Sequence, residues 1–243
     1  MLRFLRLPER FVVQEFKKNI STALQQEIAR IWDRETAVRG PRLFNGPLFS
    51  VEQLSADVVI GRFIEYRLFL AQLRRPELFS ELRVQPLAVT GLLQNKEGLF
   101  FGLRSPGVAQ QPDCWELVPA GGIDAGTLTP DGRVQPHEQL LSELQEEVGL
   151  KTTEVSPPRL VCFCEDLDHH IFDLVWDLET TLDTKTIMAA HATIDHPEHA
   201  SILCVPWRDL NGFLAGDHRA IVAGNRDLLS HIAGDKRWMH LAK

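Results

Sequence analysis

The first part of the chain shows one clear helical repeat of apolar residues and several shorter patterns. Apolar side chains recur every three to four positions over residues 20–38, which predicts an amphipathic helix. Residues 41–49 are rich in turn-forming types, and residues 50–60 carry an extended pattern. A second helix is predicted over residues 66–73. This order favours a small α+β unit over residues 1–83.

From residue 84 onward, strand patterns and helix patterns alternate. A polar four-residue turn joins the first two strands as a hairpin. Strands are predicted at residues 87–93, 98–104, 115–118, 159–165, 171–179 and 201–207, and helices at 136–148, 208–214 and 225–232. Three strands, a helix, three strands and a helix predict a mixed sheet covered on both faces. The fold class is therefore α/β, an α/β/α sandwich over residues 84–243 with a smaller N-terminal α+β extension.

The helix predicted near residue 140 carries an unusual cluster of carboxylates. Glu143, Glu146 and Glu147 are spaced so that they share one helix face. Pro136 suits the first helical position, and Gly149 suits the helix end. A neighbouring apolar stripe faces the core: Leu140, Leu144 and Val148.

Three like charges on one helix turn repel one another. A hard divalent cation such as Mg²⁺ reverses the sign of that interaction, because it binds carboxylate oxygens. The alternative is a solvated acidic helix face, which is a common surface feature. The glutamates alone leave both interpretations open.

Composition and charge narrow the class of protein. The chain has 243 residues, with 44% hydrophobic and 24% charged residues, which is ordinary for a globular protein. A net charge of −7 argues against nucleic acid as a partner, since that would need a basic face. No stretch reaches 18 apolar residues, so no membrane partner is expected. Charges interrupt the first nine residues too early for a secretory signal.

The four cysteines show neither zinc spacing nor a disulfide framework. Cys162 and Cys164 lie two apart on a predicted strand, and we expect both to pack in the core. A reducing cytoplasm is the expected location. The histidines form no clear ligand set: His169 and His170 are adjacent, and His191, His196 and His199 fall in a segment that reads as a polar loop.

The segment before the acidic helix, residues 115–126, reads as a strand that runs into a glycine-rich loop. Loop, helix and glutamates together resemble the Nudix box of the Nudix hydrolases. Gly121 matches the first glycine of that pattern, and residues 143–150 match its end without a gap. The resemblance implies a Nudix fold over roughly residues 84–235.

Three departures from the family pattern concern activity. Thr127 stands where the family has a loop glutamate, residues 128–134 are inserted before the helix, and Ser142 replaces the family arginine. That arginine mainly braces a catalytic glutamate in the family. The absence of the family glutamate and arginine is therefore expected to affect the rate of catalysis and the geometry of the site more than the binding of metal. The insertion either shapes the mouth of the substrate site or lengthens a surface loop.

The N-terminal part adds a second, less specific resemblance. Residues 31–32, 42–49 and 65–70 resemble the N-terminal region of the atypical Nudix branch that cleaves UDP-glucose and UDP-galactose. That branch also has an irregular box with an insertion after the glycine loop. The rival branch cleaves ADP-ribose or dinucleotides, and its boxes are usually complete.

The resemblance implies a site built on the box. Mg²⁺, or alternatively Mn²⁺, would be held by Glu143, Glu146 and Glu147 and by the backbone carbonyl of Ala120. Either Glu147 or Glu198 would accept the proton of the attacking water. We expect the substrate to contact three further residues: Arg104 at the phosphates, and Gly121 and Gly122 in the loop.

Several residues remain as alternatives for these roles. Asp195, or the acidic loop of Glu165, Asp166 and Asp168, could replace Glu198. Phe44 and Phe49 could cover the nucleotide or seal the two parts of the chain. Trp115 is expected in the core.

The predicted function is Mg²⁺-dependent cleavage of a nucleoside diphosphate sugar, which for UDP-glucose gives UMP and glucose 1-phosphate. The first alternative is an ADP-ribose or dinucleotide pyrophosphatase. The second is a Nudix-like nucleotide-binding sensor without catalysis, which Ser142 and Thr127 favour and the three glutamates oppose. A homodimer is possible, because Nudix enzymes often dimerise.

Overall fold

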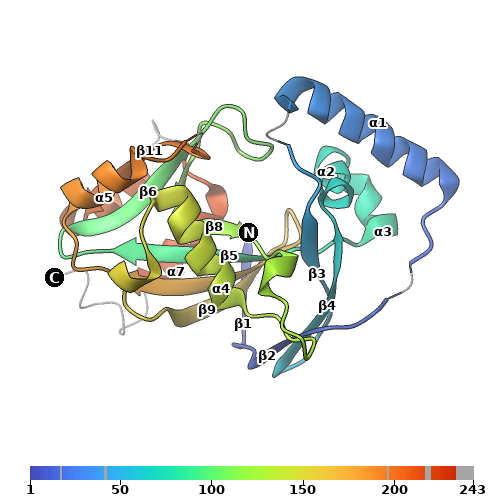
Figure 1. Cartoon of the computed structure of the whole chain (residues 1–243), viewed down its shortest axis with the longest axis horizontal. Coiled ribbons are helices and arrows are strands. Elements are labelled where there is room, and N and C mark those ends of the chain that lie inside the picture. The colour runs from blue at the N-terminus through green and yellow to red at the C-terminus, as the bar shows by residue number, and fades with distance from the viewer. Residues whose placement is uncertain (17, 41–42, 196, 217–219, 234–243) are drawn as a thin grey trace.

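The fold is organised around one mixed β-sheet of eight strands (Figure 1). The computed structural model describes residues 1–16, 18–40, 43–195, 197–216 and 220–233. Six strands follow one another across the sheet: β1 (Leu2–Leu5), β9 (Arg159–Asp166), β10 (Ile171–Glu179), β5 (Leu87–Gln94), β6 (Gly98–Arg104) and β11 (His199–Pro206). β10 and β5 are parallel, whereas their neighbours pair antiparallel. The predicted α/β class with a mixed sheet is confirmed.

Two short strands lie between the central strands β5 and β6. These two pair through Gln94 and Leu99 beside their turn, and further along each pairs with a different strand. β7 (Trp115–Leu117) pairs with β6, and β8 (Ala120–Gly122) pairs with β5. The glycine-rich segment therefore lies in the middle of the sheet, with its backbone fixed by strand pairing.

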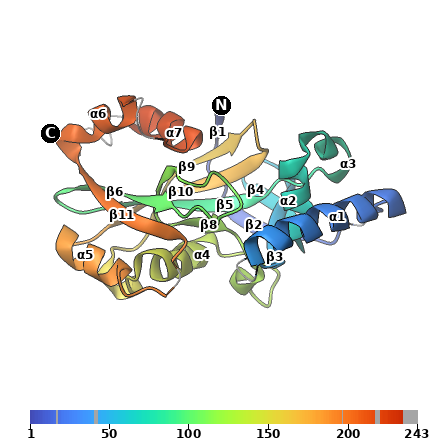
Figure 2. The same ribbon diagram turned by 90° about the horizontal axis from the view of Figure 1, so that it is seen from above.

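Helices cover both faces of the sheet (Figure 2). On one face lie α4 (Pro136–Glu143), the π-turn Leu144–Val148 and α5 (Thr184–His191); on the other lie α6 (Leu210–Ala215) and α7 (Ala223–Ala233). The stripe of Leu140, Leu144 and Val148 is fully buried in the first layer. A second apolar cluster joins the opposite sheet face to α6 and α7. The predicted three-layer sandwich is confirmed.

The N-terminal part forms a three-stranded sheet with helices beside it. The sheet order is β2 (Arg10–Val13), β4 (Val58–Glu65), β3 (Pro47–Leu54), and the helices are α1 (Thr22–Arg39), α2 (Tyr66–Arg74) and α3 (Phe79–Leu82). One 3-10 turn, Pro76–Leu78, belongs to this part of the chain. Three others lie after residue 84, at Ala125–Thr127, Thr152–Glu154 and Trp207–Asp209. These helices and β3 share an apolar cluster of their own.

This N-terminal part is joined to the central sheet by backbone hydrogen bonds. The N–H of Val51 donates to the carbonyl of Gln85 at 2.8 Å, and the N–H of Phe49 donates to that of Ile123 at 2.8 Å. Strand β1 itself belongs to the central sheet. The division at residue 84 stays a prediction, but the two parts share hydrogen bonds, a strand and the main apolar cluster.

Two sequence-based expectations were wrong, and one helix was not predicted. Residues 50–60 form the turn of a hairpin and not one strand, because β3 ends at Leu54 and β4 begins at Val58. Residues 184–191 form α5, which the side chain of Asp183 caps by accepting from the N–H of Thr186. His191 is therefore buried at a helix end, and His199 is buried in β11; neither lies in a polar loop. His196 lies outside the described residues.

Two further sequence features have a clear structural place. Cys162 and Cys164 both belong to the apolar cluster beneath α7, and all four cysteines are free thiols. No helix in the described ranges has the length and apolar character needed to cross a membrane.

Candidate active site

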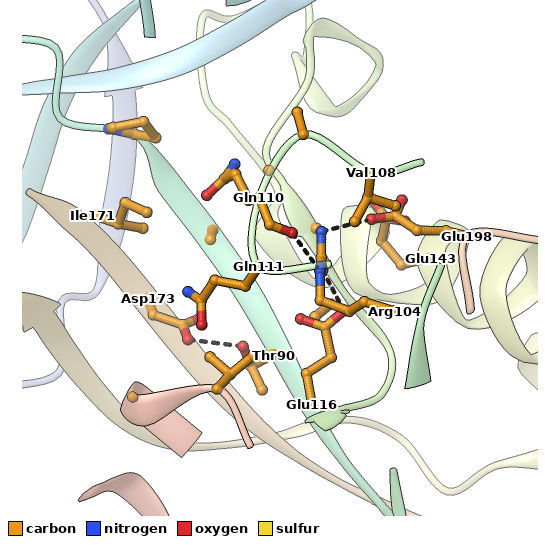
Figure 3. A pocket seen from close by; sticks show the side chains of 18 of the residues that line it. Thr90, Arg104, Val108, Gln110, Gln111, Glu116, Glu143, Ile171, Asp173 and Glu198 are labelled. Carbon is orange, nitrogen blue, oxygen red and sulfur yellow. Dashed lines mark hydrogen bonds and ion pairs between the residues drawn. The ribbon is translucent and has the colours of Figure 1, made fainter. Parts of the chain in front are cut away.

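A pocket of about 740 Å³ opens beside the glycine-rich strand β8. That volume falls within the usual range for small-molecule sites, roughly 300–1,000 Å³. Its walls come from β8, from the N-terminal part, from residues 105–111 and from residues 197–198. Figure 3 shows Arg104, Glu116, Glu143 and Glu198 gathered on one side of it.

The acidic helix places two carboxylates directly against the backbone of β8. Glu147 is only 3% exposed; its Oε2 accepts from the N–H of Ala120 at 2.8 Å, while its buried Oε1 has no hydrogen-bond partner in the described structure. Glu143 lies so close to Gly121 that a β-carbon there would be 1.8 Å from its Oε1. The π-turn that follows Glu143 sets this geometry, and such turns are frequent at functional sites.

Burial makes both carboxylates difficult to ionise without a cation. It raises the pKa of Glu143 to about 8, against the hydrogen bond from Gln139 and with the help of the nearby charges of Glu146 and Glu198. Burial and then the Glu143 charge raise the pKa of Glu147 well above its usual value. A divalent cation would offset these penalties, and carboxylate oxygens are the ligands that Mg²⁺ prefers. The donor chemistry therefore fits the expected metal.

The third glutamate of the triplet lies outside this buried pair. Glu146 is exposed and accepts a hydrogen bond from the Ser142 hydroxyl at 2.7 Å. Within the described ranges, no three His, Cys, Asp or Glu side chains are grouped closely enough to form a metal site. The expected triplet thus consists of an inner pair, Glu143 and Glu147, and an outer Glu146.

Gln139 braces the inner pair, a role that the sequence did not suggest. Its amide N–H donates to Glu143 Oε1 at 2.9 Å, and its carbonyl accepts from the N–H of Asp124 at 3.0 Å. The helix and the glycine loop are thereby tied together. Gln139 lies one helical turn before Glu143, and that spacing was the only signal in the sequence. Thr127 is buried and donates to the carbonyl of Asp124, so it stabilises the loop turn.

Arg104 is already engaged by carboxylates of the protein. It pairs with Glu116, and its second terminal nitrogen lies 3.0 Å from Glu198 Oε1. Its Nε donates to the carbonyl of Gln110 at 3.0 Å. Arg104 lines the pocket, and its guanidinium also orients Glu198 (Figure 3), while its contact with phosphates stays a prediction.

A buried histidine extends this network towards the inner pair. His199 is 0% exposed; its Nε2 lies 2.7 Å from Glu116 Oε1 and its Nδ1 lies 3.7 Å from Glu147 Oε1. Hydrogen bonds therefore join Arg104 to Glu116 and Glu116 to His199, and His199 lies beside Glu147 without a hydrogen bond to it. Glu116 and His199 are 83 residues apart, and nothing in the sequence indicated their contact.

The remaining candidates divide between pocket and core. Phe44 is 77% exposed and lines the pocket, whereas Phe49 is fully buried in the core. Trp115 packs against Phe213 in the second apolar cluster, as expected. Asp195 is exposed and is not among the lining residues.

The carboxylates of the acidic loop formed by Glu165, Asp166 and Asp168 all have partners within the protein. Glu165 pairs with Arg3, and Asp168 pairs with the N-terminal ammonium group. Asp166 lines the pocket and contacts Nδ1 of His169 at 2.7 Å. Glu198 lines the pocket and its charge adds to the raised pKa of both Glu143 and Glu147, whereas Glu165 and Asp168 do not line the pocket.

Comparison with known proteins identifies a similar fold but no sequence family. No protein-family model and no curated protein matches the chain. The crystal structure of DR0079 from Deinococcus radiodurans superposes with a TM-score of 0.52 at 16% identity, covering 76% of this chain and 98% of that one. At this identity the similarity shows a shared fold and no more.

Two structures named as Nudix hydrolases are similar at a lower level. The NUDIX hydrolase from Nitrosomonas europaea has a TM-score of 0.43 at 11% identity, over 62% of this chain and 90% of its own. A NUDIX-family hydrolase from Clostridium perfringens has a TM-score of 0.39 at 14% identity, over 60% and 95%. Both TM-scores are too low to establish a shared fold.

Proposed function

We propose that this protein is a divalent-metal-dependent Nudix hydrolase that cleaves the pyrophosphate of a nucleoside diphosphate sugar of the UDP-glucose type. One observation carries the proposal. Glu143 and Glu147 are buried against the glycine-rich strand β8 at a pocket of about 740 Å³, with one carboxylate oxygen lacking a partner in the described structure. The two segments that meet there are the ones whose sequence resembles the Nudix box.

Glu143 and Glu147, together with the Ala120 carbonyl, would hold the metal, Mg²⁺ or alternatively Mn²⁺, and the exposed Glu146 lies outside this pair. A bound cation would neutralise the negative charge of the pyrophosphate and lower the pKa of a water molecule that it binds. Gly121 and Gly122 carry no side chain that would keep the phosphates from the strand. A β-carbon at Gly121 would instead strike Glu143.

Glu198 is the proposed general base. Its carboxylate is half-exposed at the pocket, and Arg104 holds one of its oxygens at 3.0 Å. In the reaction, a water oxygen forms a bond to one phosphorus atom while the bridging P–O bond breaks. The water proton passes to Glu198, and the bridging oxygen leaves with the second phosphate. UDP-glucose would thus give UMP and glucose 1-phosphate.

The N-terminal part supports a substrate that is larger than a pyrophosphate. Phe44, Tyr66 and Phe69 supply aromatic rings to the pocket lining. Aromatic side chains can stack on a nucleobase, and stacking of this kind tolerates different bases. The same part of the chain resembles the UDP-sugar branch in sequence. These three aromatic side chains therefore favour a nucleotide substrate whose base packs against them.

The decisive experiment is product analysis with Mg²⁺ and four substrates: UDP-glucose, UDP-galactose, ADP-ribose and NADH. UMP release from the UDP-sugars, lost in Glu147→Gln, is the expected result. Glu138→Gln is the matched control, because Glu138 lies on the same helix, is exposed and does not line the pocket. AMP from ADP-ribose, with UDP-sugars untouched, would replace the substrate and keep the chemistry.

A non-catalytic nucleotide sensor is the second candidate, and the position of Ser142 favours it. Ser142 bonds the outer Glu146 and leaves the inner pair without the family arginine. Nucleotide binding without turnover of any of the four substrates would support this function. Ser142→Arg would then be the variant to test for restored hydrolysis.

A further inference from the structure

The pocket has a second polar side, opposite the buried glutamates and formed by β10 and β5. Asp173 lines the pocket there, and its Oδ2 accepts a hydrogen bond from the hydroxyl of Thr90 at 2.7 Å (Figure 3). Its Oδ1 is shielded from solvent and has no hydrogen-bond partner in the described structure. A shielded acceptor without a donor is costly, so it calls for an explanation.

The strand neighbours of Asp173 carry small side chains. Strand pairing places Ala88 on one side of Asp173 and Cys164 on the other, and both side chains are small. Asp173 lines the pocket, and the torsion that turns its carboxylate is broad, so a rotation about this torsion would present the shielded Oδ1 to a ligand. The Gln111 side chain, with donor and acceptor atoms, lies between Asp173 and Arg104 in the close view (Figure 3).

The chemistry of this side favours hydrogen-bond donors and disfavours anionic groups. Burial raises the pKa of Asp173 to about 6, the Thr90 hydrogen bond opposes that rise, and the Glu116 charge adds to it. At neutral pH the group is still mainly a carboxylate, which accepts hydrogen bonds and repels phosphate. Oδ1 has no donor in the described structure, and Oδ2 keeps a second lone pair beside the Thr90 hydroxyl, so the carboxylate can accept from two adjacent hydroxyl groups. The aromatic lining residues come instead from the N-terminal part.

We propose that Asp173, oriented by Thr90, is a hydroxyl-binding subsite that holds a sugar ring of the substrate through adjacent hydroxyl groups. The inference rests on the proposed function, because it assigns part of the same pocket. Adjacent hydroxyls occur both in the sugar released as sugar 1-phosphate and in ribose, and the experiment distinguishes the two.

The test compares the wild-type chain with Asp173→Asn and Thr90→Val on UDP-glucose. Both variants are expected to raise KM about 10- to 100-fold with little change in kcat, since they remove ground-state contacts to the sugar. Thr90→Ser keeps the hydroxyl and is expected to behave as wild type. Glu138→Gln controls for loss of a negative charge elsewhere in the protein, because Glu138 is exposed and does not line the pocket.

Deoxy substrates identify the sugar. UDP-sugars that lack one glucose hydroxyl should raise KM for the wild type but not further for Asp173→Asn, whereas 2′-deoxyuridine diphosphate glucose should affect both proteins alike. The reverse pattern assigns the subsite to ribose. An unchanged KM in both Asp173→Asn and Thr90→Val, with folding verified by thermal denaturation, overturns the proposal.

Calorimetric binding of UDP-glucose keeps the inference separate from catalysis. If the wild type binds UDP-glucose without hydrolysing it, the proposed activity fails while the subsite is still tested. A tenfold or greater loss of affinity in Asp173→Asn then supports the subsite, and equal affinity overturns it. No binding of UDP-glucose by the wild type overturns both.

Discussion

At the scale of single residues, the inner carboxylates depend on the absence of a side chain on the neighbouring strand. Gly121 pairs with Val89 in the sheet, and its missing β-carbon leaves the space that Glu143 Oε1 occupies. The clash that a side chain would cause is with the end of a flexible glutamate and not with backbone. A substitution there should therefore displace the carboxylate and leave the fold intact.

Gly121→Ala is expected to lower kcat/KM by about 100-fold or more, because misplacing a catalytic group by about 1 Å can cost that much. The melting temperature should stay within about 2 °C of wild type, since a change away from packed core costs little. Gly212→Ala is a suitable control, because its added β-carbon meets no atom within 4 Å. Full activity in Gly121→Ala would show that Glu143 does not act from its present position.

Asp173 gives a pH-dependent contribution to stability. Its pKa rises from 3.8 to about 6 on folding, so the folded state holds the proton over that window and the unfolded state does not. Stability is therefore lost as the pH rises from about 4 to 6, and the penalty is complete above 6. Asp173→Asn should stabilise the protein at pH 7.5 by about 1–3 kcal/mol and have little effect at pH 4, as measured by urea unfolding.

Asp166→Asn should show the opposite dependence. Burial raises the pKa of Asp166, but the His169 hydrogen bond and the Asp168 N–H outweigh it, and the pKa is lowered overall. The stability from this group is present at neutral pH and lost in acid. Parallel pH profiles for the two variants would contradict the assignment of Asp173 Oδ1 as a buried acceptor without a donor.

At the scale of elements, the insertion at residues 128–134 joins the N-terminal part to the glycine loop. Leu128 and Val134 form a bridge, and the turn between them meets strand β2. The N–H of Val13 donates to the carbonyl of Gly132 at 2.9 Å, and the N–H of Val134 donates to that of Phe11 at 3.0 Å. None of the inserted residues is among those that line the pocket. The insertion therefore anchors β2 and does not shape the pocket mouth.

Replacing residues 129–133 by two glycines is expected to lower stability by about 1–3 kcal/mol, as two backbone hydrogen bonds and part of an apolar contact are lost. Amide exchange of Val13 should accelerate while that of β10 amides stays slow, because local opening is confined to the weakened element. The KM for UDP-glucose should not change. A raised KM with unchanged exchange at Val13 would place the insertion in substrate binding instead.

Helices and strands were predictable from the sequence where a long periodic pattern of apolar residues is followed by a residue that ends the helix or strand. The strand predicted over residues 171–179 coincides with β10, and the helix predicted over 66–73 differs from α2 by one residue. β1 and β2 have four residues each, too few for a period to show. α5 was missed because only Ile187 and His191 of its eight residues are buried, which is too few for a helical repeat of apolar residues to show.

The contacts in the candidate site likewise divide into those that the sequence predicts and those that it does not. The contact of Glu143 and Glu147 with residues 120–122 follows from a motif that is local in the chain. The contacts of Glu116 with His199 and of Thr90 with Asp173 each join residues 83 apart, across strands that are not consecutive. Such pairs depend on sheet order, which hydrophobic periodicity does not encode.

At the scale of the whole molecule, the pocket gathers more negative than positive charge. Glu116, Glu143, Glu198, Asp166 and Asp173 line it, against the cations Arg39 and Arg104. Arg39 is paired with Glu35, and Arg104 with Glu116 and Glu198. A pocket of this charge repels a pyrophosphate unless a cation binds first. The free energy of unfolding should therefore depend on divalent metal.

Saturating Mg²⁺ is expected to stabilise the native state by about 2.7 kcal/mol at 100 times its dissociation constant. For a chain of this size, that corresponds to a rise in melting temperature of about 5–10 °C. The double variant Glu143→Gln/Glu147→Gln should lose this rise. In EDTA it should melt no lower than wild type, because its buried amides carry no charge to desolvate. Glu138→Gln, with NaCl matched to the ionic strength of the Mg²⁺ samples, is the control. A rise of equal size in the double variant would place the metal away from the acidic helix and remove the main support for the proposed hydrolysis.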